Sequence, residues 1–278
     1  MKLKFHNFEF NFLKKTYIMG IINVTPDSFF DGGKYFNFQK AVDHAFRLID
    51  EGADILDIGG ESTRPGAEPV SIDEELRRVI PVIEAISKRI SIPISIDTYK
   101  ARVAEEAIKA GATIINDISG LRFDPQMSTI ASKYKVPVIV MHIKGTPKDM
   151  QKNPYYEALI PEIIEYLRDS VVIAKQAGVD ENMIIIDPGI GFGKLPEHNL
   201  TIIKNLREFS NLGKPLLIGV SRKSFIGKVL NESLPEKRLE GTASAVAISV
   251  INGANIVRVH DVGFMAKVVK MADAIKFS

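Results

Sequence analysis

The stretch PISIDTYKARVAEEAIKAGATIIND, residues 93–117, carries the pattern that decides the fold. It begins with an apolar run that ends at Asp97, continues with a helix-patterned segment over residues 100–110, and closes with a second apolar run that stops at Asn116. Gly111 follows the helical segment, in a position where glycine commonly ends a helix. Apolar strands that alternate with helical segments are typical of a parallel sheet covered by helices. The stretch therefore predicts a strand, a helix and a strand in succession.

The same alternation occurs eight times along the 278 residues. Eight such units are the number that closes a (β/α)8 barrel, and barrels of this kind commonly run to about 250 residues as one unit. We therefore expect an α/β fold, a TIM (β/α)8 barrel, with residues 1–278 forming a single domain. Apolar and polar residues alternate through residues 1–16, which indicates a short N-terminal β-hairpin that caps the floor of the barrel.

The expected elements follow from apolar periodicity and from residues that start and stop helices. The first barrel strand is expected at 17–23, and helices are expected at 38–51, from Ser71 to about 89, and at 100–110, 157–177 and 240–252. Ser71 and Glu74 have the spacing of a capping box. The connections at 24–37, 61–70 and 142–154 are too rich in Gly, Pro and polar residues for regular structure. Long ordered connections of this kind tend to be lids or binding loops.

The composition limits the classes of function. The 36 basic and 34 acidic side chains are well mixed and leave a net charge of +2, so the basic stripe of a nucleic-acid-binding protein is not evident. No apolar run approaches the roughly 18 residues of a membrane span, and the first residues lack the apolar region of a secretory signal. The chain has no cysteine, which fits a reducing compartment. We expect a cytoplasmic protein with no nucleic-acid and no membrane partner.

Polar residues at the ends of the apolar runs are the first candidates for function, because catalytic groups of this fold lie where the strands end. They are Asn23, Asp57, Glu61, Asp97, Asn116, Asp117, His142, Asp187, Ser221, Lys223, Arg258 and His260. Residues two apart in a strand share a face, so Arg258 and His260 are expected to point one way, and so are Ser221 and Lys223. An Arg beside a His suits an anion whose protonation changes. A surface ion pair is the alternative.

Asp97, Asn116, Asp187 and Lys223 are expected to form a planar hydrogen-bonding frame around the barrel mouth. Such a frame fits a flat heterocycle, because a carboxylate accepts two parallel N–H bonds and a lysine donates to an oxygen or a ring nitrogen. Each aspartate could instead cap the helix that follows it. The carboxylates could also bind a metal, although they lack a recognisable ligand spacing.

Three further features are weaker signals. DPGIGFGK, residues 187–194, lacks the GxGxxG order of a dinucleotide site, and its glycines are expected to let backbone approach a ligand beside the ring of Phe192. Arg64 follows a strand and is either a solvated rim charge or an anion clamp. His142 is expected to be a buried, hydrogen-bonded core residue.

The segments NVTPDSF, DIGGESTRPGA, ISIDT, NDISG, DPGIGFGK, GVSRKSFIG and RVHDV resemble, in order and spacing, the dihydropteroate synthase family. The resemblance spans about residues 17–261. It implies a transferase that joins 6-hydroxymethyl-7,8-dihydropterin diphosphate to p-aminobenzoate and releases diphosphate, giving 7,8-dihydropteroate on the folate route. It also implies that Mg2+ accompanies the diphosphate and that the protein is a homodimer.

The resemblance assigns residues to three subsites. The pterin would contact Asp97, Asn116, Met141, Asp187, Phe192, Gly219, Lys223 and Arg258. The diphosphate would contact Asn23, Thr63, Arg64, Arg258 and His260, with Asn23 also near the metal. The p-aminobenzoate would lie among Phe29, Thr63, Arg64, Pro65, Phe192, Lys223 and Ser224. The catalytic residues would be Asp97, Asp187, Lys223 and Arg258.

The implied mechanism is governed by charge. Departure of diphosphate leaves positive charge on the pterin methylene, so an SN1-like path requires no nucleophilic residue, and Asp97 and Asp187 would stabilise the cation. One alternative is a methyltetrahydrofolate:corrinoid methyltransferase, which shares the Asp/Asn/Asp frame but has no use for GESTRPG or SRKS. Another alternative is a subunit that binds pterin without turnover. Loss of Lys223 or damage to the lid loop would indicate that case.

Overall fold

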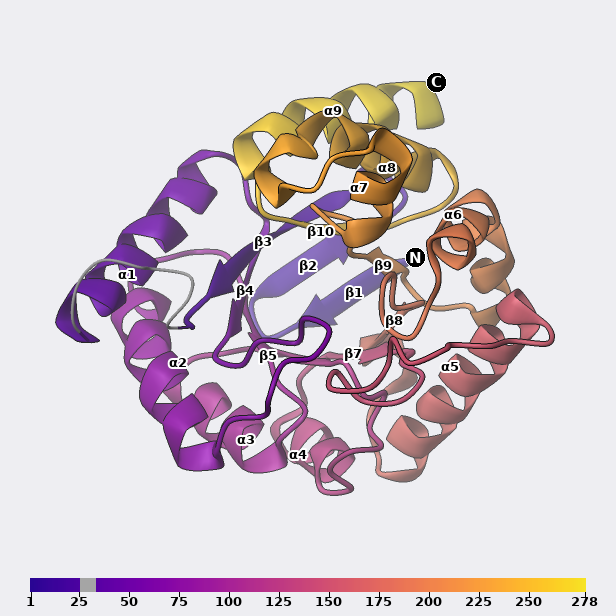
Figure 1. Ribbon diagram of the computed structural model, residues 1–278. Coiled ribbons are helices and arrows are strands. Elements are labelled where there is room, and N and C mark those ends of the chain that lie inside the picture. The colour runs from indigo at the N-terminus through magenta and orange to yellow at the C-terminus, as the bar shows by residue number, and fades with distance from the viewer. Residues whose placement is uncertain (26–33) are drawn as a thin grey trace.

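The structure is a computed structural model that describes residues 1–25 and 34–278. Figure 1 looks along the axis of a barrel of parallel strands that is surrounded by helices. The barrel strands are β3 (Tyr17–Asn23), β4 (Ile55–Gly59), β5 (Ile94–Asp97), β6 (Ile114–Asp117), β7 (Val138–Met141), β8 (Ile184–Asp187), β9 (Leu217–Ile218) and β10 (Ile256–Val259). The predicted TIM (β/α)8 barrel is therefore confirmed.

The eight strands pair in the order β8, β7, β6, β5, β4, β3, β10, β9, and each of these seven pairings is parallel. The remaining gap, between β8 and β9, is bridged in parallel by Ile186 and Leu216. The backbone N–H of Ile186 donates to the carbonyl of Pro215 there, at 2.9 Å. The sheet thus closes on itself, which brings the carboxyl ends of all its strands to one face of the molecule.

The helices lie between successive strands and cover the outside of the barrel. They are α1 (Lys34–Asp50), α2 (Ile72–Ser87), α3 (Ala101–Ala110), α4 (Met127–Tyr134), α5 (Leu159–Gln176), α6 (Pro196–Lys204), α7 (Ser224–Leu230), α8 (Leu239–Ile251) and α9 (Val262–Lys276). Short 3-10 turns lie at Glu181–Met183, Leu206–Leu212 and Pro235–Lys237. No helix in the described part of the chain is long and apolar enough to cross a membrane.

The helix ends agree with the sequence prediction to within about two residues, except that α1 begins at Lys34 and not at Phe38. The hydroxyl of Ser71 accepts the backbone N–H of Glu74 at 3.2 Å, as the predicted capping box requires. The Glu74 carboxylate instead binds Arg77 and Arg78. Gly111, with φ of 123°, ends α3.

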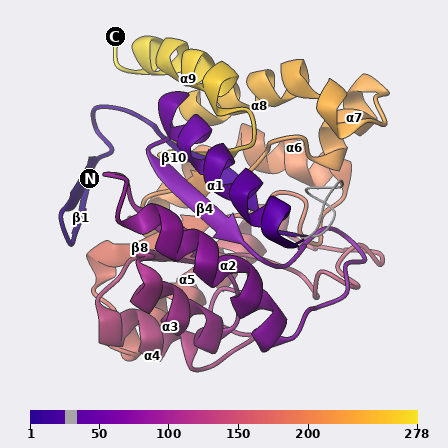
Figure 2. The same ribbon diagram turned by 90° about the vertical axis from the view of Figure 1, so that its left-hand side faces the viewer.

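The N-terminal hairpin forms the floor of the barrel, as predicted. Strands β1 (Lys2–Phe5) and β2 (Phe8–Asn11) pair antiparallel, and Figure 2 shows them at one end of the barrel, with the loops that follow the strands at the other. A floor cluster of buried side chains joins the hairpin to the barrel interior. It consists of Leu3, Phe5, Phe10, Phe12, Tyr17, Met19, Ile55, Ile114, Ile139, Ile185, Leu217 and Ile256.

Candidate active site

A layer of polar side chains lies directly above the floor cluster, inside the barrel. Two positions after the floor residues Ile55, Ile114, Ile185 and Ile256 come Asp57, Asn116, Asp187 and Arg258. Alternate residues of a strand share a face, so these polar side chains point to the same interior as the floor residues. Each lies within two residues of the carboxyl end of its strand, and the layer therefore lies near the open end of the barrel.

The four residues of the predicted frame converge on one pocket in this layer. It is lined by Ile21, Thr63, Asp97, Asn116, Ile118, Met141, Asp187, Ile190, Phe192, Gly219, Ser221, Lys223, Arg258 and His260. Polar and charged side chains thus converge in the pocket beside an apolar wall of Ile, Met and Phe side chains, and such concave sites with converging polar groups are typical of small-molecule binding.

Arg258 lies between two carboxylates that come from different strands. Its Nε donates to Asp57 Oδ2 at 2.5 Å, and its Nη2 donates to Asp97 Oδ2 at 2.6 Å. Asn116 Nδ2 donates to the same Asp57 oxygen at 3.2 Å. The side chain of Asp57 is fully buried, so its negative charge is balanced inside the protein by the guanidinium. The alternative of a surface ion pair for Arg258 is wrong.

Asp57 is one of the strand-end candidates named from the sequence, but it is not among the four residues of the predicted frame. The signal that finds it is its position two residues after the floor residue Ile55. Asp117, in contrast, faces away from the barrel interior. Its carboxylate accepts the backbone N–H groups of Ser119 and Leu121, at 2.8 and 2.9 Å, and so shapes the turn after β6.

The helix-cap alternative for Asp97 is also wrong. The backbone N–H of Ala101, at the start of α3, donates to Asp124 Oδ2 at 2.8 Å and not to Asp97. Asp187 does accept one backbone N–H, that of Gly189 at 2.7 Å. Gly189 has φ of 69°, and a Cβ on it would lie 1.9 Å from the carbonyl oxygen of His142, so only glycine permits this turn.

Lys223 reaches the pocket from the start of a helix and not from a strand, so its predicted strand position is wrong. Strand β9 ends at Ile218, and Lys223 is the residue before α7. The intervening Arg222 has φ of 57°, so Ser221 and Lys223 are not alternate residues of a strand. Lys223 Nζ donates to the carbonyl of Ile190 at 2.7 Å and lies 4.2 Å from the centre of the Phe192 ring. Both contacts hold the ammonium at the pocket wall.

Burial shifts the pKa values of the charged groups in the pocket toward neutrality. It raises the pKa of Asp97 to about 7, against the opposing effect of Arg258, and it raises the pKa of Asp187 to about 6. Burial lowers the pKa of Lys223 to about 8, although Asp187 opposes the shift. The pKa of Arg258, which burial alone would lower, is raised by Asp57 and Asp97. Groups with such shifts in one pocket are characteristic of functional sites.

His260 is a neutral group beside these charges. Burial, together with the nearby Arg258 and Arg222, lowers its pKa to about 3, so its imidazole is uncharged at pH 7. Its Nδ1 lies 2.9 Å from the hydroxyl of Ser221. Arg258 and His260 line the same pocket, as the sequence predicted.

The other predicted site residues are distributed around the pocket. Asn23 lines an adjoining hollow of about 510 Å³, with Ile21, Lys40, Asp43, His44, Arg47 and His260. Thr63 lines the pocket itself. Arg64 and Pro65, in the loop after Thr63, and Ser224, the first residue of α7, are exposed and do not line it. Phe29 lies outside the described residues.

His142 is a buried core residue, as predicted. Its Nδ1 lies 2.9 Å from Lys194 Nζ, which also donates to the carbonyl of Phe192 at 2.9 Å. The ring of His142 packs edge-on against Tyr166. Within residues 1–25 and 34–278, no three His, Asp or Glu side chains are grouped as a metal site. Asp97 and Asp187 therefore do not belong to a cluster of that kind.

The fold and the pocket agree with a class of known proteins, the pterin-binding enzymes. The sequence profile described as "Pterin binding enzyme" matches residues 19–260. Within this class, the chain belongs to the dihydropteroate synthase family. The dihydropteroate synthase of Bacillus subtilis is 54% identical over 265 residues, which cover 95% of this chain and 90% of that protein. The resemblance noted from the motifs is thereby confirmed, and the protein is a transferase.

Solved structures of this family have the same fold as this chain. The dihydropteroate synthase of Clostridium difficile, crystallised in the presence of pteroic acid, is 48% identical with a TM-score of 0.91, covering 97% of this chain and 100% of that chain. The enzyme of Xanthomonas albilineans in complex with 7,8-dihydropteroate is 38% identical with a TM-score of 0.90, and the match covers 100% of both chains. The fold is thus shared with enzymes whose structures were determined in the presence of pteroic acid or in complex with 7,8-dihydropteroate.

Substitution of Asp57 tests the balance of charge in the pocket. Asp57→Ala leaves Arg258 with Asp97 alone and is expected to lower the free energy of unfolding by about 3–5 kcal/mol, because it breaks a buried ion pair. The measurement is urea unfolding followed by circular dichroism. Glu181→Ala, which removes an exposed partner of Lys175, is the control and should leave this free energy nearly unchanged, because exposed ion pairs contribute little to stability. Equal losses in the two variants would contradict the assignment.

Proposed function

We propose that the protein condenses 6-hydroxymethyl-7,8-dihydropterin diphosphate with p-aminobenzoate to give 7,8-dihydropteroate and diphosphate. The observation that carries this proposal is the convergence of Asp97, Asn116, Asp187 and Lys223 on a single pocket at the open end of the barrel. These residues come from four separate segments, and their side chains offer the acceptors and donors that the edge of a pterin ring requires.

The pterin would lie in the pocket between these polar groups and the apolar wall. The carboxylates of Asp97 and Asp187 would accept N–H groups of the ring system, and Lys223 would donate to an oxygen or a nitrogen of the ring. Met141, Phe192 and Gly219 line the pocket beside them. Gly219 leaves the space that a larger side chain would fill, and the Phe192 ring offers a flat apolar surface.

The diphosphate would lie toward Asn23 and His260, where the pocket meets the adjoining hollow. Arg258 would supply charge there while it remains tied to Asp57, and Thr63 and Arg64 would approach from the loop after β4. Mg2+ fits this region as an ion held by diphosphate oxygens and water with Asn23 as a protein ligand, because Mg2+ keeps several waters and binds through substrate phosphates. When bound, it would supply positive charge to the departing diphosphate.

The p-aminobenzoate would enter at the exposed rim. Pro65, Arg64 and Ser224 are exposed around this entrance, and Thr63, Phe192 and Lys223 line the pocket below it. Phe29 would complete this subsite. The aryl amine then needs chiefly orientation, because it attacks a carbon that is already electron-poor.

The chain's own residues account for the charge changes of the reaction. Cleavage of the bond between the methylene carbon and the diphosphate oxygen leaves positive charge on the pterin, and the electron pair departs with the diphosphate. Asp97 and Asp187 would stabilise the cationic ring by fixed negative charge in a site shielded from water. The amine nitrogen forms the new bond to the methylene carbon and then loses a proton, so no covalent intermediate with the protein is required.

Two other functions are less well supported. A methyltetrahydrofolate:corrinoid methyltransferase would share the Asp97, Asn116 and Asp187 frame but would not require Thr63 and Lys223 at the pocket wall. A pterin-binding subunit without turnover would not need the pKa of Lys223 and of the aspartates to lie near neutral pH.

We also propose that the protein acts in the cytoplasm, which the lack of cysteine supports.

The direct test is an assay with both substrates and Mg2+, in which release of diphosphate depends on p-aminobenzoate. Lys223→Ala should lower kcat/KM at least about a hundredfold, because it removes a positioned donor and charge from the pocket. Its thermal unfolding should change little, since Lys223 contributes only a carbonyl hydrogen bond and a ring contact to the fold. Turnover near that of the unsubstituted protein would remove Lys223 from the site.

Pterin affinity should depend on pH through the two aspartates. The affinity for a pterin lacking the diphosphate is expected to be full above pH 7 and to be lost as the pH falls through about 7 and about 6, where Asp97 and Asp187 take up protons. Each protonation can contribute up to a tenfold loss per pH unit. Calorimetry between pH 7.5 and 5 measures the effect. Asp187→Asn should make the profile less steep below about pH 6, because only Asp97 would still take up a proton, and an unaltered slope there would contradict the assignment.

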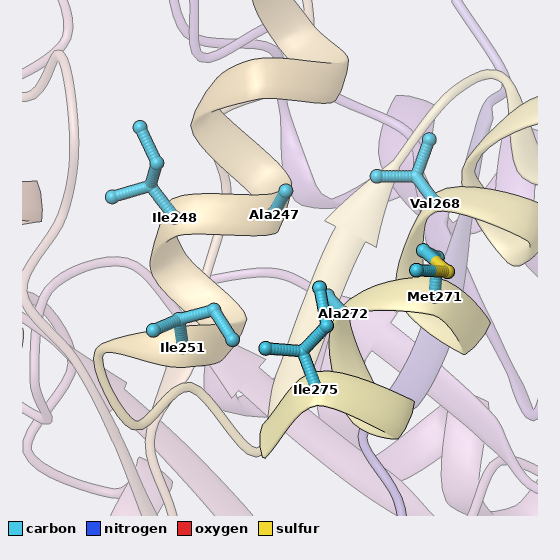
Figure 3. Close-up of a pocket in the computed structure, with 7 residues that line it drawn as sticks. All are labelled: Ala247, Ile248, Ile251, Val268, Met271, Ala272 and Ile275. Atoms are coloured by element: carbon cyan, nitrogen blue, oxygen red, sulfur yellow. The ribbon is translucent and has the colours of Figure 1, made fainter.

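A homodimer is the proposed assembly, and the face formed by α8 and α9 supports it. Figure 3 shows the residues that line a groove between these helices, which are Ala247, Ile248, Ile251, Val268, Met271, Ala272 and Ile275. The groove has a volume of about 450 Å³. Ile248, Met271 and Ile275 are 51%, 63% and 58% exposed. An exposed apolar patch of this kind marks an interaction surface.

Sedimentation velocity at micromolar concentration tests this assembly. The protein is expected to sediment as a particle of twice the chain mass of 30.8 kDa. Met271→Glu should shift it toward the mass of one chain, because a charge would be buried in the interface. Leu13→Glu, at a 69% exposed residue beyond the hairpin, is the control and should leave the mass unchanged. A single-chain mass for the unsubstituted protein would rule the dimer out.

A further inference from the structure

We propose that Lys100 is a positioning residue for the reaction, because it closes the base of the loop that carries Thr63, Arg64 and Pro65. This loop, residues 62–69, lies between β4 and α2, and its base is formed by Glu61 and Val70. The inference rests on the proposed function, which places p-aminobenzoate beneath this loop. Lys100 itself lies outside the pocket, so it would act on the substrate only through the loop.

The ammonium of Lys100 has three hydrogen-bond donors, and each has a partner at the base of the loop. Nζ donates to Glu61 Oε2 at 2.6 Å, to the carbonyl of Val70 at 2.8 Å, and to Glu75 Oε2 at 2.6 Å. Glu61 precedes the loop, Val70 follows it, and Glu75 belongs to α2. One side chain thus holds both ends of the loop and the helix after it.

Glu61 completes the closure. Its Oε2 accepts the backbone N–H of Val70 at 2.8 Å, and its Oε1 accepts the hydroxyl of Tyr99 at 2.5 Å. The side chains of Glu61, Glu75 and Lys100 are only 5%, 1% and 13% exposed. In such surroundings charge-assisted hydrogen bonds are strong, and loss of the single cation would leave two carboxylates facing each other.

The tip of the loop has much weaker support. The backbone N–H of Gly66 donates to the carbonyl of Pro147 at 2.9 Å, and Glu68 pairs with Lys148, but these two side chains are 70% and 62% exposed. Exposed ion pairs contribute little to stability. The position of Thr63 and Arg64 over the pocket therefore depends mainly on how firmly the base is closed.

Lys100 also relates the loop to the pocket. It lies three residues after Asp97, in the short segment between β5 and α3. Gly59, at the end of β4, packs against the same aspartate, since a Cβ on it would lie 3.4 Å from Asp97 Cβ. Asp97 keeps its own partner, Arg258. Loss of Lys100 should therefore move the loop and leave the pterin subsite in place.

The experiment compares Lys100→Met with Lys100→Arg, Tyr99→Phe and the control Ile86→Val, which creates a small cavity at a fully buried residue of α2 away from the loop base. Three quantities are measured for each variant. They are the KM for p-aminobenzoate, the Kd for a pterin lacking the diphosphate, and the hydrogen–deuterium exchange of residues 62–70.

Lys100→Met is expected to raise the KM for p-aminobenzoate at least about tenfold and to speed exchange of the loop, because a displacement of about 1 Å is enough for such losses. The pterin Kd should change less than about twofold, since Asp97 is unaffected. Lys100→Arg should recover most of the KM, because it restores the cation, and Tyr99→Phe should lie between the two. Ile86→Val should lower the unfolding temperature without changing the KM or the loop exchange.

Two results would overturn the inference. One is an unchanged KM for p-aminobenzoate in folded Lys100→Met. If Lys100→Met does not fold, an unchanged KM in Tyr99→Phe has the same meaning. The other is a parallel rise in KM and pterin Kd in all variants, including Ile86→Val, which would indicate a general loss of structure. Failure of the unsubstituted protein to turn over would instead contradict the proposed function, and the exchange of residues 62–70 would then still decide whether Lys100 closes the loop.

Discussion

The site depends on one guanidinium, that of Arg258, which holds two carboxylates from neighbouring strands at the centre of the barrel mouth. Closing eight parallel strands brings Asp57 and Asp97 to the same guanidinium and places Asp187 in the same pocket as Asp97, and neighbouring carboxylates disfavour each other's ionisation. Arg258 bonds to Asp57 and to Asp97, which allows both to remain where the chain places them. The orientation of the pterin frame therefore depends on a contact that is buried beneath it.

The register of the strands explains why such a contact exists. The floor cluster and the polar layer are successive inward-facing positions of the same strands, so the hairpin that seals the floor also defines which residues form the site. A shift of one residue in β10 would turn Arg258 outward toward the helices and bring Val257 or Val259 inward. The apolar floor thus specifies the position of the polar layer, and the two cannot be varied independently.

Much of this could be read from the sequence, because strand periodicity and strand ends are local signals. Asp97, Asn116, Asp187 and Arg258 each end a short apolar run, and the structure places all four at one pocket. The pairing of Arg258 with Asp57 could not be predicted, since it joins residues 201 positions apart and requires the sheet register. The apolar pattern wrongly assigns Lys223 to a strand, because neither the end of β9 at Ile218 nor the positive φ of Arg222 leaves a mark in it. The hydrogen bonds of Lys100 could not be predicted either, because they depend on three elements that meet only in the folded chain.

The balance of charge in the pocket suggests how ligand binding and ionisation are linked. Three carboxylates, Asp57, Asp97 and Asp187, face two cations, Arg258 and Lys223, and burial raises the pKa of Asp97 to about 7 and that of Asp187 to about 6. A pterin that donates N–H groups to these carboxylates favours their charged form, so its arrival should displace protons held by the empty site. Asp97 and Asp187 would then carry their full negative charge only when the pterin ring, which becomes cationic during the reaction, is bound. The diphosphate, which such charge repels, is best accommodated on the side of Asn23 and the neutral His260.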